Sequence, residues 1–207
     1  MVTLLCTVRD CRLPLACEER RLVCARNHSF DIARSGYCNL LQPQDRRSRQ
    51  PGDSAAAVAA RRRFLDRGFG EPIVRDIVRF IESGTAAAVQ ILDAGCGEGY
   101  HLNAIRESRI PNPESHGTDI SVPAIDAAAR RYRDCFFVVA NADRFLPYAD
   151  RSFALVTSIT SRMNPDEFRR VLRDDGRLLV AIPAPDDLIE LREAVLGEAK
   201  LIDRVER

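Results

Sequence analysis

The chain has 207 residues, of which 45% are hydrophobic and 29% charged, and its net charge is +1. That length suits one α/β domain with a small extra module, and no apolar run approaches the roughly 18 residues that cross a bilayer. Because the N-terminus also lacks a signal-peptide pattern, we expect a cytoplasmic protein without membrane contact. Its seven cysteines are then metal ligands or core thiols, not disulfides.

The charge is unevenly distributed along the chain. Residues 1–63 contain 12 arginines against six acidic residues, whereas residues 64–207 contain 19 basic and 24 acidic residues. The positive N-terminal part is where a polyanion such as nucleic acid would bind.

Cysteine and histidine near the N-terminus are spaced as in a metal site. Cys6 and Cys11 form one pair, and Cys24 and His28 form a second pair 12 residues later. This spacing predicts two turns that close one tetrahedral Zn²⁺ site, so residues 1–41 are predicted to be a zinc-binding module stabilised by the metal. Unconnected thiols in a flexible leader are the alternative, as is a site in which Cys17 replaces one ligand. The remaining cysteines are interpreted as core or loop thiols, namely Cys38, Cys96 and Cys135.

Residues 42–69 are predicted to form a basic linker and helix. Pro51 and Gly52 break the chain, and Asp53 or Ser54 can cap a helix over residues 55–68. Basic side chains along such a segment can follow phosphates, although a solvated linker would have the same composition. The candidate RNA-binding residues are Arg46, Arg47, Arg49, Arg61 and Arg62.

A glycine-rich loop follows the predicted strand at residues 89–92. Glycines at 95, 97 and 99 follow Asp93, and a helix begins at Tyr100. This pattern resembles motif I of S-adenosylmethionine (SAM) dependent methyltransferases, in which glycines let the backbone approach the cofactor. A second strand ends at Asp119, which we expect to bind ribose hydroxyls, and a third covers residues 136–140. The candidate cofactor-binding residues are Asp93, Gly95, Cys96, Gly97, Glu98, Gly99, Asp119, Ile120, Asn141, Ala142 and Asp143.

The remaining elements complete a Rossmann-like, mostly parallel α/β sheet in residues 70–207. A strand at 153–157, a helix capped by Asn164, a strand at 177–182 and a helix at 186–200 are expected. No residues remain for the last two strands of a full methyltransferase sheet, so the domain is predicted to be C-terminally incomplete, with an exposed edge that favours association. The catalytic residues are unknown; the candidate pocket residues are Ser158, Thr160, Ser161, Arg162 and Asn164.

The order of motifs along the chain resembles the 23S ribosomal RNA (guanine-N1)-methyltransferase family. The resemblance includes Cys24-x3-His28, Gly36-Tyr37, residues 47–54, and the loop at residues 92–100. It implies SAM-dependent methylation of guanine N1 in a 23S rRNA hairpin loop, a zinc ribbon that helps to hold the RNA, and a homodimer.

The chain departs from that family at several positions. The first cysteine pair is more widely spaced, Gly70 stands where an aromatic residue is frequent, and residues 158–163 lack the usual aromatic-small-Pro sequence. Asp187 replaces a frequent histidine. A noncatalytic RNA-binding protein with a degenerate SAM pocket, or a methyltransferase of small molecules, therefore remains an alternative.

Overall fold

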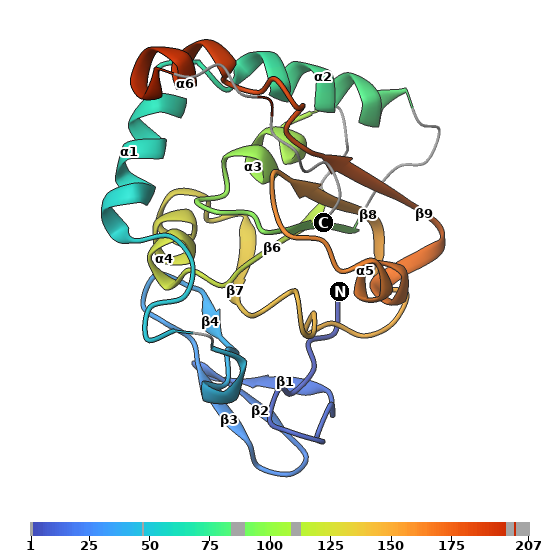
Figure 1. The fold of residues 1–207 in the computed structure, drawn as a ribbon. Coiled ribbons are helices and arrows are strands. Elements are labelled where there is room, and N and C mark those ends of the chain that lie inside the picture. The colour runs from blue at the N-terminus through green and yellow to red at the C-terminus, as the bar shows by residue number, and fades with distance from the viewer. Residues whose placement is uncertain (1, 47, 84–89, 109–112, 198–200, 202–207) are drawn as a thin grey trace.

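The computed structural model describes residues 2–46, 48–83, 90–108, 113–197 and 201, and its fold is shown in Figure 1. At the N-terminus, β1 (Leu15–Glu18), β2 (Arg21–Cys24) and β3 (Ser29–Asp31) form a small antiparallel sheet. Glu19 has a positive φ of 53° and lies in the turn between β1 and β2. This small sheet carries the Cys24 end of the predicted metal site.

A parallel six-stranded sheet forms the centre of the molecule, with strand order β4-β7-β6-β5-β8-β9. Its strands are β4 (Cys38–Asn39), β5 (Gln90–Ala94), β6 (Glu114–Asp119), β7 (Cys135–Val139), β8 (Phe153–Ile159) and β9 (Leu172–Ala181). Sequences such as Phe-Phe-Val-Val in β7 are typical of strands buried on both faces. The predicted Rossmann-like sheet is confirmed, and β4 joins it as an edge strand from the N-terminal segment.

Six α-helices and one short 3₁₀ helix connect these strands in the described residues. The 3₁₀ helix is η1 (Pro43–Asp45), and the α-helices are α1 (Ala55–Leu65), α2 (Glu71–Glu82), α3 (Tyr100–Arg106), α4 (Val122–Arg131), α5 (Pro165–Val171) and α6 (Ile189–Leu196). Side-chain caps start three of them: Ser54 accepts a hydrogen bond from Ala57 N, Ser121 from Ala124 N, and Asn164 from Glu167 N. In these residues no helix is both long and apolar enough to span a membrane.

Different elements pack on the two faces of the central sheet. On one face, ribbon residues Leu4, Leu22 and Phe30 belong to the same buried cluster as Leu92 and Tyr148. On the other face, α2, α3 and α4 contribute a second cluster, which includes Ile77, Leu102 and Ile125. The N-terminal ribbon therefore shares a hydrophobic core with the central sheet.

Several predicted boundaries were wrong by a few residues. The helix predicted at 55–68 ends at Leu65, and the last helix is confined to Ile189–Leu196, with 198–200 outside the described residues. The first sheet strand continues through Asp93 and Ala94, because Gly95 is the first residue with a positive φ. β9 begins at Leu172, since an irregularity in its pairing with β8 accommodates the polar stretch before Arg177.

Candidate cofactor crevice, zinc site and arginine groove

The glycine-rich loop links β5 to α3 through three residues in the left-handed region. Gly95, Gly97 and Gly99 have φ values of +86°, +54° and +80°. The amides of Gly95 and Cys96 donate to the Thr118 carbonyl at 2.7 and 3.1 Å, and Gly97 N donates to Asp119 Oδ2 at 3.0 Å. The loop is thus fastened to the end of β6, and each glycine adopts a backbone conformation that other residues rarely take.

A crevice of about 410 Å³ opens at the carboxyl ends of the parallel strands. It lies where the strand order reverses between β5 and β8, the place at which open α/β sheets bind ligands. Of the predicted cofactor residues, the following line it: Gly95, Asp119, Ile120, Asn141, Ala142 and Asp143.

The linker supplies a wall of this crevice that the sequence analysis did not foresee. Ser48, Pro51, Gly52 and Asp53 line it. Gly52 packs so closely on Ser121 that an added Cβ would lie 2.7 Å from the Cβ of that residue, and Ser121 Oγ donates to the Asp53 carbonyl at 2.7 Å. The Pro51-Gly52 pair signalled a turn but could not signal what the turn would contact.

The two predicted carboxylates have different environments. Asp93 is only 1% exposed and accepts a hydrogen bond from Thr157 Oγ1 at 2.8 Å, while burial raises its pKa to about 7. Asp119 faces the crevice and accepts hydrogen bonds from the amides of Ser121 and Gly97. Burial raises the pKa of Asp119, and those amide hydrogen bonds oppose the shift. Asp93 supports the loop from behind, whereas Asp119 can reach a ligand.

A second, smaller hollow of about 160 Å³ lies on the other side of Gly95. Ser161 lines both spaces, and its Oγ lies where a Cβ on Gly95 would be. The smaller hollow includes Gly97, Glu98 and His101 in its lining. Burial, with the nearby Arg61 charge, lowers the pKa of His101 to about 4, so this imidazole is neutral at pH 7.

The candidate pocket residues at the end of β8 and after it differ in exposure and in partners. Ser158 is buried and its Oγ has no hydrogen-bond partner, Thr160 is exposed with a φ of +50°, and Arg162 pairs with Asp143 at 3.3 Å. Thr160 and Arg162 line the larger crevice with Ser161. A positive φ on a β-branched residue is a strained conformation.

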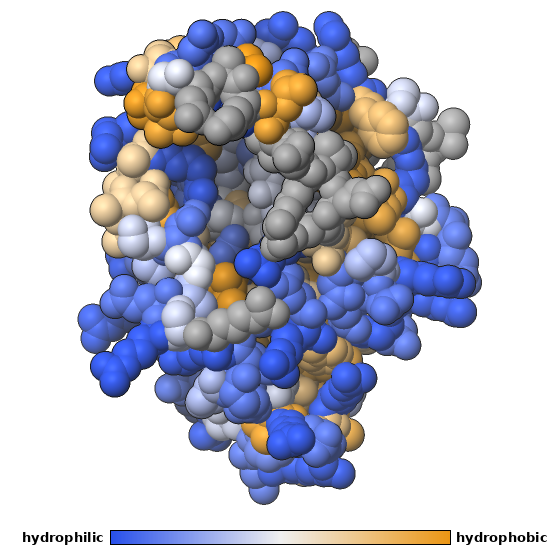
Figure 2. Space-filling model, viewed as in Figure 1, coloured by the Kyte–Doolittle hydropathy of each residue, from blue (hydrophilic) through white to orange (hydrophobic). Residues whose placement is uncertain are grey.

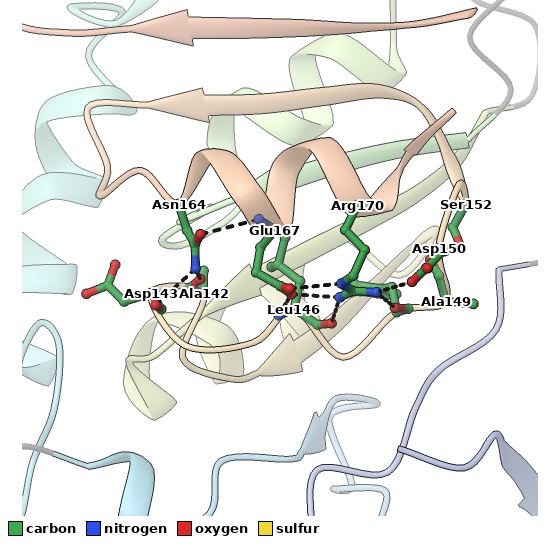
Figure 3. A network of polar contacts seen from close by, with 10 residues as sticks. Ala142, Asp143, Leu146, Ala149, Asp150, Ser152, Asn164, Glu167 and Arg170 are labelled. Carbon is green, nitrogen blue, oxygen red and sulfur yellow. Dashed lines mark hydrogen bonds and ion pairs between the residues drawn. The ribbon is translucent and has the colours of Figure 1, made fainter. Parts of the chain in front are cut away.

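Asn164 holds the loop after β7 against α5. Its Nδ2 donates to the carbonyls of Ala142 and Asp143 at 3.2 and 3.0 Å, while its Oδ1 caps the helix (Figure 3). Farther along α5, Arg170 donates to the Leu146 carbonyl and pairs with Glu167, and Glu167 Oε2 accepts from Leu146 N. These contacts fix the loop that borders the crevice.

The predicted metal ligands converge. Potential ligand atoms of Cys6, Cys11, Cys24 and His28 all lie within 4.8 Å of one another. The Sγ atoms of Cys11 and Cys24 are 3.8 Å apart, and His28 Nδ1 lies 3.3 and 3.5 Å from those of Cys6 and Cys24. A tetrahedral Zn²⁺ with Zn–S bonds of about 2.3 Å separates its sulfur ligands by about 3.8 Å, the distance between Cys11 and Cys24, so the cluster fits zinc.

The other cysteines lie outside this cluster. Cys17 is exposed on the β1–β2 hairpin, with its Sγ 4.0 Å from the Glu19 carbonyl oxygen. Cys38 and Cys96 are buried, and Cys135 is partly buried. The longer first spacing is accommodated by a turn in which Cys11 N donates to Val8 O at 3.0 Å and Asp10 has a φ of +60°.

The predicted RNA-binding arginines fall into two groups. Arg46 and Arg49 are exposed, and Arg47 lies outside the described residues. Arg61, in contrast, donates to Glu98 Oε2 at 2.7 Å and also pairs with Asp53, and Arg62 lies 3.8 Å from Asp66. The Arg61 guanidinium faces the glycine loop and two carboxylates, an arrangement unsuited to a phosphate.

A groove of about 350 Å³ runs between the metal cluster and the cofactor crevice. Arg9, Arg12 and Arg144 line it, and the Arg12 guanidinium lies 4.6 Å from the centre of the Phe145 ring. Ala140 and Asn141 line both this groove and the cofactor crevice. These arginines were not predicted from the sequence, because they are far apart in the chain and none belongs to a basic run.

The fold and the two centres define the class of protein: a SAM-dependent methyltransferase domain joined to a zinc ribbon. The family model described as "Methyltransferase domain" matches residues 91–180, and the one described as "RlmA, N-terminal" matches residues 5–49. A methyltransferase in complex with the Trm112 activator from Haloferax volcanii has a TM-score of 0.53 at 20% identity, covering 72% of this chain and 68% of its own. A SAM-dependent methyltransferase structure from Methanococcus maripaludis has a TM-score of 0.54 at 18% identity, covering 72% and 73%.

Relatives of known name are more specific. A 23S rRNA (guanine(748)-N(1))-methyltransferase of Streptomyces fradiae is 35% identical over 95% of this chain and 69% of its own length. Proteins of Micromonospora griseorubida and Bacillus subtilis, provisionally named as 23S rRNA (guanine-N(1)-)-methyltransferases, are 36% and 37% identical. These two matches include 85% and 86% of this chain, and 63% and 64% of the relatives' own lengths. It belongs to the 23S rRNA (guanine-N1)-methyltransferase family, and the resemblance read from its motifs is confirmed.

Proposed function

We propose that this protein methylates N1 of a guanine in a 23S rRNA hairpin loop with SAM as the methyl donor. The observation that carries the proposal is the arginine-lined groove, which connects the zinc ribbon to the cofactor crevice through Ala140 and Asn141. A methyltransferase of small molecules has no need of such a path. Arginines bind phosphates along an RNA strand, and the aromatic ring of Phe145 lies in the same groove.

We assign the adenosine end of the cofactor to the larger crevice. Asp119, with both oxygens anchored by amides, is suited to the ribose hydroxyls, and the loop at residues 141–143 borders the base. When bound, SAM supplies an activated methyl group on a sulfonium. The chain's part is to hold that methyl in line with guanine N1 and to accept or relay the N1 proton.

The residues next to this reaction belong to the segment after β8. Thr160, Ser161 and Arg162 follow the strand and line the crevice, Ser158 lies buried near the end of β8, and Asn164 positions the neighbouring loop. A guanine taken out of its hairpin stack would present its Watson–Crick edge to these side chains. Which of them assists the N1 proton is open to direct test by single substitutions.

We propose three functional parts in the chain, with the boundaries expected from the sequence. Residues 1–41 are the zinc-binding, RNA-recognition module, 42–69 the basic linker and helix, and 70–207 the methyltransferase domain. The linker also lines the cofactor crevice through Gly52 and Asp53, which supports coupling between RNA and cofactor binding. An rRNA substrate would place the enzyme in the cytoplasm with the ribosome.

We further propose a homodimer that forms one RNA-binding cleft. Figure 2 shows apolar residues at the surface over α6, where Leu191, Val195 and Leu196 are 55%, 71% and 69% exposed. Among the described residues, β9 has no strand on its outer side. Exposed apolar area of this kind favours association. Analytical ultracentrifugation should give twice the 23.2 kDa mass, and a monomer at micromolar concentration would reject the proposal.

The test of the proposed activity is methyl transfer from radiolabelled SAM to 23S rRNA hairpin fragments. Because N1 methylation blocks Watson–Crick pairing, reverse transcription should stop beside one guanine, and replacement of that guanine by inosine, which keeps N1, should retain methylation. An Asp119→Ala variant provides the cofactor-defective control. Label transfer to metabolites but not to RNA would favour a small-molecule enzyme, and RNA binding without transfer would favour a noncatalytic protein.

A further inference from the structure

Arg61 has one nitrogen that the protein leaves without a partner. Its Nε donates to Glu98 Oε2 at 2.7 Å and its Nη1 donates to Asp53 Oδ2 at 2.5 Å. Nη2 is buried and has no hydrogen-bond partner. A Cβ on Gly97 would lie 3.0 Å from this nitrogen, so Nη2 faces the glycine-rich loop.

Glu98, the partner of Arg61, has an unpaired hydrogen-bond acceptor. Its side chain is 7% exposed, Oε2 is bonded to Arg61, and Oε1 is buried without a partner. A buried donor and a buried acceptor left unpaired each lose the hydrogen bonds that water would supply, and native proteins leave few such groups. Two unpaired atoms on one ion pair, beside a hollow of about 160 Å³, indicate a ligand that carries both an acceptor and a donor.

The charges around the hollow define that ligand more closely. Among the described residues that line it, Arg61 is the one permanent cation, because His101 is neutral at pH 7. Asp53, Glu98 and Asp119 also line it. A group with a single carboxylate and a neighbouring ammonium would meet the cation with one end and the acidic residues with the other.

The hollow adjoins the larger crevice at Gly95 and Ser161, so one extended ligand can occupy both. We propose that Arg61 and Glu98 bind the amino-acid end of SAM, with Arg61 Nη2 donating to the carboxylate and Glu98 Oε1 accepting from the ammonium. This inference rests on the proposed cofactor and deepens it: Arg61, expected from the sequence to contact RNA, recognises the cofactor. Asp53 then acts as a positioning residue that links the linker to the cofactor.

The test compares ligands that differ only at this end. Isothermal calorimetry measures binding of S-adenosylhomocysteine, of its decarboxylated analogue, which keeps the amine, and of 5′-methylthioadenosine, which has neither charged group. Arg61→Gln should weaken S-adenosylhomocysteine by about 10- to 100-fold, as expected for loss of a charged hydrogen bond, and leave the other two within about twofold. Glu98→Gln should weaken both ligands that carry the amine and spare methylthioadenosine.

Arg62→Gln is the matched control, since it removes an arginine from the same helix that pairs with Asp66 at 3.8 Å and does not line the hollow. Equal weakening of all three ligands by Arg61→Gln, or of none, would overturn the inference while the proposed function stood. If Arg61→Gln does not fold, wild-type protein must still prefer S-adenosylhomocysteine to the decarboxylated analogue by tenfold or more, and equal affinities would overturn it. Failure of wild type to bind any of the three would overturn the proposed cofactor itself, and the inference with it.

Discussion

At the scale of single residues, the two carboxylates nearest the glycine-rich loop differ in their surroundings. Asp93 ends up inside the sheet, where Thr157 is its hydrogen-bonding partner, and Asp119 lies at the crevice with amides on both oxygens. From their positions in the sequence, both aspartates were predicted to contact the cofactor. Their different burial means that one should affect mainly stability and the other mainly affinity.

Asp93 should make the protein less stable as the pH rises. Its folded pKa of about 7 lies above 3.8, the ordinary pKa of an aspartate, so folding favours the protonated form. The free energy of unfolding from this group is therefore greatest below pH 4 and is lost as pH rises through 7. Asp93→Asn keeps an acceptor for Thr157 and should be more stable than wild type at pH 8, on the order of 4 kcal/mol, and about equal at pH 4.

Urea unfolding of wild type and Asp93→Asn at pH 4, 6 and 8 measures this difference. Asp187→Asn, at an exposed position, serves as the control and should follow wild type. A constant difference between wild type and Asp93→Asn across that range would show that Asp93 does not titrate there.

Asp119 should act on the cofactor. Asp119→Ala removes the acceptors for Gly97 N and Ser121 N together with the proposed ribose contacts, so S-adenosylhomocysteine should bind more weakly by about 1.5–3 kcal/mol. Asp119→Asn, which retains one acceptor oxygen, should lose less. Calorimetry on both folded variants is the measurement, and full affinity in Asp119→Ala would remove Asp119 from the binding site.

At the scale of elements, short sequence motifs predicted the turns and helix caps but not the lengths of the strands. The Asn164 cap, the glycine loop and the two ligand pairs were all readable, because each depends on neighbours within a few residues. β9 was half missed, since Asp174, Asp175 and Gly176 interrupt its apolar pattern and the pairing irregularity that accommodates them is a property of β8 as well. The ends of α1 and α6 were overextended for lack of a strong stop signal.

Zinc should stabilise more than the ribbon. Cys24→Ser removes one ligand of the cluster, and the protein should lose its approximately one Zn²⁺ per chain, measured by atomic emission. Because Leu22 and Phe30 share a buried cluster with Leu92 and Tyr148, the melting temperature of the whole chain should fall as well. Cys17→Ser, on the exposed hairpin, is the control; zinc loss from that variant instead would change the ligand set.

Asn164 performs two tasks that substitution can separate. Asn164→Asp keeps the cap on Glu167 N but cannot donate to the carbonyls of Ala142 and Asp143, whereas Asn164→Ala loses both functions. The alanine variant should lose about 1 kcal/mol more stability than the aspartate variant. Both should show faster amide hydrogen exchange in residues 141–146, and unchanged exchange there would mean that the loop is held without Asn164.

At the scale of the whole molecule, the function depends on contacts that no local pattern encodes. β4 pairs with β7 across about 100 residues of sequence, and that pairing brings the ribbon beside the strand ends. The linker reaches Ser121, and Arg9, Arg12 and Arg144 come together in one groove. The sequence therefore predicted which chemical groups were present and the sheet that carries them, but the groove and the role proposed for Arg61 required the tertiary structure.

The groove gives the prediction that separates an RNA enzyme from a metabolite enzyme. Replacing Arg9, Arg12 and Arg144 with Gln should weaken binding of a 23S rRNA hairpin and flatten its salt dependence by up to roughly 0.7–0.9 per lost phosphate contact, because fewer counterions are released. Affinity for S-adenosylhomocysteine should not change. The effect should also be similar for hairpins of unrelated sequence, since phosphate contacts position the RNA without specifying it.

The matched control removes the same charge from another hollow, the one between α5 and β9, which is lined by Arg151, Arg169 and Arg173. A nonspecific loss of positive charge would weaken RNA binding equally in both triple variants, because long-range attraction depends on net charge. If the groove contacts phosphates directly, RNA affinity should depend less steeply on salt concentration in the groove variant than in the control variant. Equal slopes, measured between 50 and 200 mM salt by fluorescence anisotropy, would place the RNA elsewhere on the surface.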